Sequence, residues 1–340
     1  MKNILLLASL LSTLTLLCAA EPPSAKIANG RIQAKIYLPG ASRGYYHATR
    51  FDWSGVIYSL KFQGHEYYGP WFNKTSPTVH DFVYDGSDIV AGPCTAITGP
   101  VDEFGEVGWD DAKPGSTFIK IGVGALRKPD DGAAYDKFHL YEIADSGKWK
   151  IGKKHDAIEF TQTLSDSSSG YGYVYRKTIQ LTSGKPEMVL QHSLKNTGGH
   201  TIRTNVYNHN FLALDGKPPG PGLTISVPFQ IQSSQPLNQA LAEIRGNQVI
   251  YLSTLKDRDL VTTPLKGFGA RVEDNQIRIE NRILGAGMNI VADRPLDSES
   301  LWSIRAVVAM EPFVAIAIEP GQEFTWKSTY EYYTLPETGK

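Results

Sequence analysis

The hydrophobic and polar positions of this 340-residue chain alternate along most of its length. In 55–62, for example, Val56, Tyr58, Leu60 and Phe62 are apolar, whereas Ser59 and Lys61 are polar. Successive side chains of a strand point to opposite faces, so this pattern predicts a strand with one buried face. The same pattern, bounded by turn residues, predicts strands at 118–123, 157–164, 173–181, 188–194, 202–207, 223–229, 248–252, 276–281, 304–309, 314–318 and 324–332.

Helical periodicity is nearly absent, and 237–244 is the one segment predicted as a short helix. So many strands without alternating helices favour an all-β fold, a large and mostly antiparallel β-sandwich. The stiff segment 217–222 is interpreted as a connection between two strands, and residues 81–115 as long loops on one face. No repeat and no low-complexity linker divides the chain, so residues 21–340 are predicted to form a single domain.

The first twenty residues predict export. A lysine at position 2 precedes the apolar run 4–17, and small residues follow at 18–20, which is the order of a secretory signal peptide cleaved after Ala20. The run is shorter than the ~20 residues that cross a bilayer. Lipid modification of Cys18 ranks second, because the bulky Leu17 precedes it. We therefore expect a periplasmic or extracellular protein with no transmembrane segment, in which Cys94 forms no intrachain disulfide.

Charge and composition exclude one class of partner. The formal net charge is −1, and the 34 Lys and Arg residues are dispersed along the sequence, which argues against binding to nucleic acid. The 17 Tyr and 6 Trp residues suit stacking on sugar rings and suit a β-sheet core equally well. Composition alone therefore does not identify a ligand.

The most informative motif joins two predicted strands. One strand ends in Asn-Thr-Gly at 196–198, and the next ends in Tyr-Asn-His-Asn-Phe at 207–211. Polar side chains that converge at a strand end need hydrogen-bonding partners or a function. His209 is accordingly either a candidate site residue or a histidine satisfied by the backbone.

This motif resembles that of the aldose 1-epimerase (galactose mutarotase) superfamily, in which the corresponding histidine is the catalytic acid. A second resemblance runs from Trp302 through Glu311 to the Pro-Gly turn at 320–321 and the final strand 329–332. It implies that Glu311 is the catalytic base. The segment 50–55 resembles the opening hairpin of the family.

The resemblance also implies sugar-binding residues. Arg50 and Asn208 are expected to hold the hydroxyls or the ring oxygen of a carbohydrate, either a free sugar or a sugar end. The family has a further active-site histidine, for which His80 and His139 are the candidates. It also has an aspartate, for which the candidates are Asp257, Asp259 and Asp293.

The implied reaction is the interconversion of sugar anomers. A base removes the proton of the anomeric hydroxyl while an acid protonates the ring oxygen, and the ring then recloses on its other face. One carboxylate and one histidine suit this exchange. No cofactor, metal or nucleotide is required, and the sequence contains no His-Glu-x-x-His or phosphate-binding Gly-rich loop.

Alternative interpretations remain for several of these residues. Glu311 could form a structural ion pair with Arg305, since an isolated buried charge is costly. The acids at 102–103 could serve a hydrolase or lyase, or could be solvated loop charges. Those at 110–111 could bind calcium or a sugar hydroxyl, or form an acidic turn. A carbohydrate-binding protein of the same fold, without turnover, is the other rival.

Overall fold

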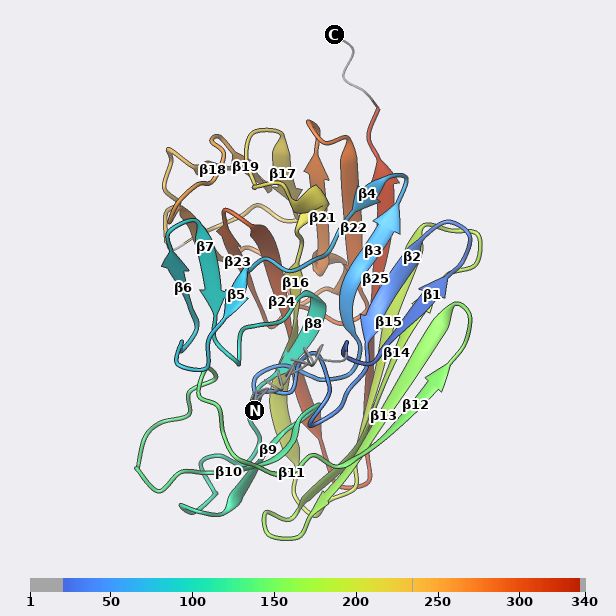
Figure 1. The fold of residues 1–340 in the computed structure, drawn as a ribbon, viewed down its shortest axis with the longest axis vertical. Coiled ribbons are helices and arrows are strands. Elements are labelled where there is room, and N and C mark those ends of the chain that lie inside the picture. The colour runs from blue at the N-terminus through green and yellow to red at the C-terminus, as the bar shows by residue number, and fades with distance from the viewer. Residues whose placement is uncertain (1–20, 234, 337–340) are drawn as a thin grey trace, which may run out of the picture.

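The computed structural model describes residues 21–233 and 235–336, so the predicted signal peptide lies outside the described residues. Five β-sheets make up the described part of the chain, together with two short 3₁₀ turns, η1 (Leu214–Gly216) and η2 (Val272–Asp274). This architecture confirms the predicted all-β class (Figure 1). Within those residues, no helix is both long and apolar enough to cross a membrane.

The largest sheet has ten strands and runs from the lower right to the upper left of Figure 1. Its order is β12 (Lys148–Lys153), β13 (Ala157–Asp166), β14 (Tyr171–Leu181), β15 (Glu187–Asn196), β25 (Glu323–Thr334), β22 (Ala286–Ala292), β21 (Gln276–Asn281), β17 (Leu223–Ser226), β19 (Gln248–Tyr251) and β18 (Ala242–Arg245).

A five-stranded sheet packs against one face of the large sheet. Its order is β20 (Leu260–Leu265), β23 (Ser298–Ile304), β24 (Val307–Ile318), β16 (Ile202–Phe211) and β8 (Gly99–Phe104). Apolar side chains of the two sheets share hydrophobic clusters, as Leu301 and Met310 do with Met288 and Tyr330. The two sheets therefore form the predicted sandwich.

Three smaller sheets complete the fold. One has the order β1 (Ser24–Ala28), β2 (Gln33–Tyr37), β3 (Val56–Phe62) and β4 (His65–Glu66); the second has β11 (Ile143–Asp145), β10 (Gly124–Arg127) and β9 (Thr117–Lys120); the third has β5 (Lys74–Thr75), β7 (Asp88–Ala91) and β6 (Phe82–Asp85). Among the pairs of these named strands, β5 with β7 is parallel and the others are antiparallel.

The predicted helix at 237–244 is wrong. Its apolar residues Leu237 and Leu241 are buried at a helical spacing, but the backbone turns between them. The side chain of Asn238 accepts a hydrogen bond from the Ala240 amide at 3.1 Å, and strand β18 then begins at Ala242. An asparagine bonded to its own backbone in this way competes with a helix.

Two other local predictions are also wrong. The predicted strand 304–309 crosses the hairpin turn at Arg305 and Ala306, which separates β23 from β24. The predicted loops at 81–115 contain β6, β7 and β8, of which β8 is buried along its whole length. Gly and Pro residues at its ends hid this short strand.

A polar network is buried between the two main sheets. Lys177 of β14 lies 2.7 Å from the Asp102 carboxylate of β8 and 3.5 Å from that of Asp52, and none of the three side chains is more than 2 % exposed. His192 contacts Asp102 at 3.0 Å. Burial alone would raise the pKa of Asp102, but Lys177 and His192 outweigh it and hold that pKa below its usual range. These contacts fix β8 against the large sheet, because an unpaired charge there would be costly.

Candidate active site

The register of β16 and β24 determines which side chains meet at the site. Tyr207 pairs with Phe313, and the same register holds at the bridge between Leu212 and Val308. It therefore sets His209 opposite Glu311, although the two are far apart in sequence. Side chains directly opposite one another on one face of a sheet are in contact distance.

His209 and Glu311 form a direct contact. The Nε2 atom of His209 lies 3.0 Å from Oε1 of Glu311, and the two side chains are 5 % and 16 % exposed. The imidazole stacks on Phe211 with ring centroids 3.6 Å apart, and the edge of Trp302 faces it at 5.8 Å. The histidine is therefore held in place by aromatic rings, and solvent reaches the pair through Glu311.

Burial shifts the pKa values of both members. It lowers the pKa of His209 well below the ordinary value, and the positive charges of Arg50 and Lys137 add to this effect. It raises the pKa of Glu311 to about 7, against the lowering influence of those two cations.

An ion pair at 3.0 Å would shift both pKa values the other way. Desolvation of both groups opposes it, and Arg50 and Lys137 disfavour an imidazolium. The pair near neutral pH is thus a neutral imidazole beside a carboxyl that is only partly ionised.

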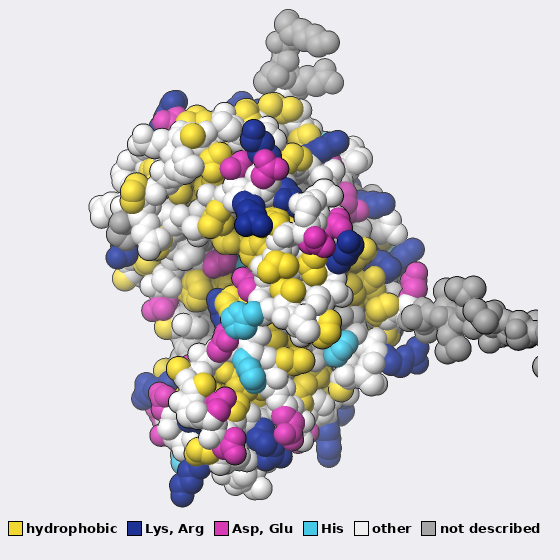
Figure 2. Space-filling model, turned by 60° about the vertical axis from the view of Figure 1, so that its left-hand side comes forward, with side chains coloured by type: hydrophobic (Ala, Val, Ile, Leu, Met, Phe, Trp, Pro, Cys, Tyr) yellow, Lys and Arg dark blue, Asp and Glu magenta, His cyan; other side chains and the backbone are white. Residues whose placement is uncertain are grey.

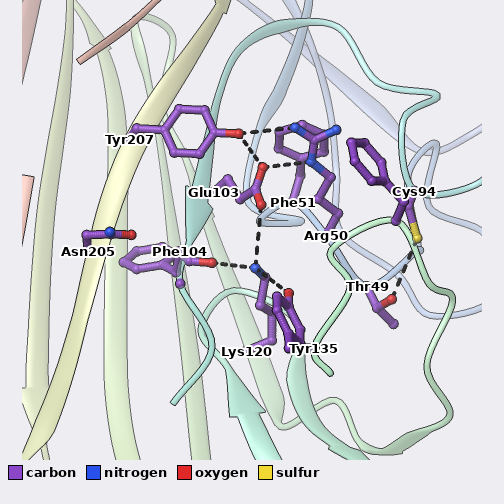
Figure 3. Close-up of polar contacts among 12 residues, drawn as sticks. Thr49, Arg50, Phe51, Cys94, Glu103, Phe104, Lys120, Tyr135, Asn205 and Tyr207 are labelled. Carbon is purple, nitrogen blue, oxygen red and sulfur yellow. Dashed lines mark hydrogen bonds and ion pairs between the residues drawn. The ribbon is translucent and has the colours of Figure 1, made fainter. Parts of the chain in front are cut away.

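Arg50 belongs to a fixed ionic cluster beside the pair. Its Nε atom donates to Glu103 at 2.7 Å and its Nη2 to the Tyr207 hydroxyl at 3.1 Å, while that hydroxyl donates to Glu103 (Figure 3). Lys120 lies 3.8 Å from the other carboxylate oxygen. Burial would raise the pKa of Glu103, but Arg50 and Lys120 outweigh it, and that pKa falls to about 2.

The structure does not bring Asn208 into this site. Neighbouring residues of a strand point to opposite faces of their sheet. Asn208 therefore points toward the large sheet, while His209 points to the opposite face of the five-stranded sheet. Its amide donates to Asp102 at 3.1 Å and its carbonyl oxygen accepts from Tyr330 at 2.9 Å. Asn208 is therefore engaged by Asp102 and Tyr330 on the opposite face of the sheet from His209 and Glu311.

The two other candidate histidines, His80 and His139, are exposed. The Nε2 atom of His80 is 2.5 Å from Asp136, and its ring lies 5.2 Å from Phe138. His139 packs its ring against Tyr141 at 4.6 Å. His80 is thus engaged in holding a loop, and neither histidine contacts the His209–Glu311 pair.

Arg305 does not pair with Glu311. Its guanidinium donates to the carbonyl oxygens of Ser87 and Asp257 and lies 4.6 Å from the centroid of the Tyr84 ring. The structural ion pair considered for Glu311 is therefore absent.

The other acidic residues also lie away from the pair. Asp102 and Glu103 are buried and ion-paired within β8, so they are neither loop charges nor accessible hydrolase acids. The acids at 110–111 lie in an exposed turn. Asp259 and Asp293 accept backbone hydrogen bonds from Lys256 and Lys327.

Sequence reasoning missed the contributors from β8 and from the loop at 135–139. Glu103 pairs with Tyr207 across the strands, and Lys137 acts on Glu311 from the loop. Asp102 and Glu103 are consecutive acids, so β8 carries no period-2 signal. Figure 2 shows histidine, acidic and basic side chains gathered around a hollow on this side of the molecule.

Comparison with known proteins places the fold. No family model and no curated protein sequence matches the chain. Among solved structures it is similar to a galactose mutarotase related enzyme from Lactobacillus acidophilus, at 14 % identity and TM-score 0.54, covering 93 % of this chain and 99 % of that one.

Two further structures agree. The aldose epimerase homologue from C. elegans has 12 % identity and TM-score 0.51, with 92 % and 99 % covered. A galactose mutarotase-like protein from Lactobacillus casei has 12 % identity and TM-score 0.50, with 91 % and 100 % covered. These likenesses confirm, at the level of fold, the resemblance that the motifs predicted.

The raised pKa of Glu311 predicts a pH-dependent gain of stability in Glu311→Gln. The folded protein binds the Glu311 proton more tightly than the unfolded chain does. The contribution of this proton to the free energy of unfolding is fully present below the ordinary pKa of Glu, and it is lost as the pH rises through about 7. The glutamine cannot ionise. The free energy of unfolding of the variant, minus that of wild type, should therefore be about 2–3 kcal/mol larger at pH 8 than at pH 4.

Denaturant unfolding at several pH values measures this difference. Glu319→Gln is the control, because Glu319 is exposed just beyond the end of β24, and the stability difference between this variant and wild type should stay nearly constant with pH. A flat difference for Glu311→Gln as well would mean that its carboxylate is not desolvated.

Proposed function

We propose that this protein is an exported aldose 1-epimerase-like isomerase whose reactive pair is Glu311 and His209. The observation that carries the proposal is their 3.0 Å contact, partly open to solvent through Glu311, on a fold shared with mutarotase-like proteins. The substrate is a carbohydrate, either a free sugar or a sugar end. Arg50, which Glu103 holds beside the pair, either binds the sugar or orients the charged groups that act on the sugar.

The proton count of the pair fits the reaction. In the reactive arrangement the shared proton lies on His209: the Glu311 carboxylate takes the proton of the anomeric hydroxyl, the bond between C1 and the ring oxygen breaks, and His209 protonates the ring oxygen. The open-chain aldehyde then rotates and recloses with these roles reversed. The pair holds one proton before and after each half-reaction, so the two half-reactions need no net proton uptake from solvent.

A specific observation supports a second candidate function. His209 and Glu311 touch directly, whereas a sugar ring between them would require the contact to open. A carbohydrate-binding protein of the same fold needs no such opening. Binding of an aldose without faster anomer exchange would favour this alternative.

Removing either member of the pair should abolish most of the activity. His209→Ala and Glu311→Gln are each expected to lower the protein-dependent rate of anomer exchange by about 10²–10⁴-fold, the usual contribution of one proton transfer. Polarimetry or NMR with freshly dissolved aldoses measures this rate above the spontaneous one. His200→Ala and Glu319→Gln, both exposed, are matched controls that should retain wild-type rates. Wild-type rates in folded His209 or Glu311 variants would disprove the assignment.

The pH profile tests the protonation state. The singly protonated pair should lose activity as pH rises through about 7, where Glu311 gives up the shared proton. It should also lose activity in acid, where His209 takes up a second proton. These apparent pKa values belong to the pair as a whole. Activity that instead rises through pH 7 to a plateau would assign catalysis to the carboxylate with a neutral imidazole.

The compartment is part of the proposal. A leader cleaved after Ala20 places the protein among sugars outside the cytoplasm. N-terminal sequencing of the exported protein should begin at Glu21, and thiol titration after denaturation should find Cys94, which is free and buried. A blocked Cys18 in the membrane fraction would favour lipid anchoring instead.

A further inference from the structure

The connection between β10 and β11 contains a short segment, 136–140, that we call the strap. Tyr135 and Tyr141 flank the strap, and their rings stack in parallel with centroids 5.7 Å apart. Both rings pack in one hydrophobic cluster of the fold. Inside the strap, the amide of His139 donates to the carbonyl oxygen of Asp136 at 3.0 Å, which closes a turn. The strap is therefore a compact turn that is anchored at both ends.

The strap covers part of Arg50. Two aromatic rings lie against the guanidinium of Arg50, that of Phe51 at 4.3 Å and that of Phe138 at 4.7 Å from ring centroid to guanidinium carbon. The arginine side chain is accordingly only 6 % exposed. Phe51 is completely buried in the core, whereas Phe138 belongs to the strap and is only partly buried. Of the two rings, Phe138 is the one that can move aside to admit a solute.

The strap also covers Cys94. The carbonyl oxygen of His139 accepts hydrogen bonds from the Thr49 hydroxyl at 3.1 Å and from the Cys94 thiol at 3.6 Å. Cys94 is completely buried, and Thr49, which precedes Arg50, lies beside it (Figure 3). One movement of the strap would therefore uncover the thiol and the guanidinium together.

The strap is held to the loop that precedes β6 by a weak contact. Oδ2 of Asp136 lies 2.5 Å from Nε2 of His80, and the two side chains are 41 % and 64 % exposed. Exposed pairs of this kind contribute little to stability, because water and salt screen them. The ring of His80 lies 5.2 Å from that of Phe138, and Leu140 is exposed. Few buried contacts therefore oppose movement of the strap.

We propose that the strap is a hinged cover, which opens about Tyr135 and Tyr141 and thereby admits a ligand to Arg50. Segments that cover ligand sites are typically the ones that open locally at a low free-energy cost. This inference goes beyond the proposed function, because the strap opens in the free protein whether or not the His209–Glu311 pair exchanges anomers.

Cys94 reports this opening in the full chain, because a buried thiol reacts only while it is uncovered. Iodoacetamide alkylates the thiol at a fixed pH, and mass spectrometry of the peptide that contains Cys94 gives the rate. In wild type this rate should be about 10²–10⁴-fold below the rate in denatured protein. It should change little in low concentrations of urea, because a local opening exposes little new surface.

Two variants loosen the strap. His80→Ala removes the exposed pair and should raise the alkylation rate about two- to fivefold. Phe138→Ala removes the ring from the guanidinium and should raise it about tenfold. His155→Ala, at an exposed position, and Phe324→Ala, which loses a similar contact with Arg294 at 4.8 Å, are the matched controls and should keep the wild-type rate.

Modification of Arg50 by phenylglyoxal, mapped in the same way, tests the second half of the inference. Its rate should rise in both strap variants in parallel with the alkylation of Cys94, since one movement uncovers both groups.

Two results would overturn the inference. One is wild-type alkylation of Cys94 in both strap variants, with a steep dependence on urea, which would mean that the thiol reacts only after global unfolding. The other is faster alkylation with an unchanged rate at Arg50, which would mean that the strap does not cover the arginine. Neither readout involves a sugar, so a failure of the proposed function leaves this test unaffected.

Discussion

The site depends on the unbroken register between β16 and β24. Because side chains alternate along a strand, this register sends Tyr207 and His209 to the outer face of the five-stranded sheet and Asn208 to the inner face. A slip of one residue would exchange the two sets and would separate His209 from Glu311. The sheet thus keeps two polar systems apart although their residues are neighbours in sequence.

The two polar systems differ in how their charges are paired. In the inner one, Lys177 lies between Asp52 and Asp102, and Asn208 and Tyr330 extend the hydrogen bonding. In the outer one, burial raises the pKa of Glu311 to about 7 and lowers that of His209. Perturbed pKa values are typical of functional sites that rigid surroundings hold in place. Here the inner network supplies that rigidity.

The all-β fold could be predicted because alternation is a local property: the strand predicted at 276–281 matches the structure in full, and the one predicted at 55–62 differs only in its first residue. His209 and Glu311 were predicted from motifs that their strands carry, and the structure brings the two into contact. Asn208 was predicted together with His209 because the motif was read as a cluster, although alternation directs the two side chains to opposite faces. Lys137 could not be found, since its place depends on tertiary contacts of the loop at 135–139 and no local pattern specifies them.

The central claim is that a sugar hemiacetal is bound and opened at the His209–Glu311 pair. A crystal structure of the Glu311→Gln variant with a bound aldose tests it most directly, because the variant keeps the shape of the site and slows turnover. The account predicts the anomeric hydroxyl within hydrogen-bond distance of residue 311 and the ring oxygen within reach of Nε2 of His209. A sugar bound on another surface, with the contact between residues 209 and 311 still closed, would contradict it.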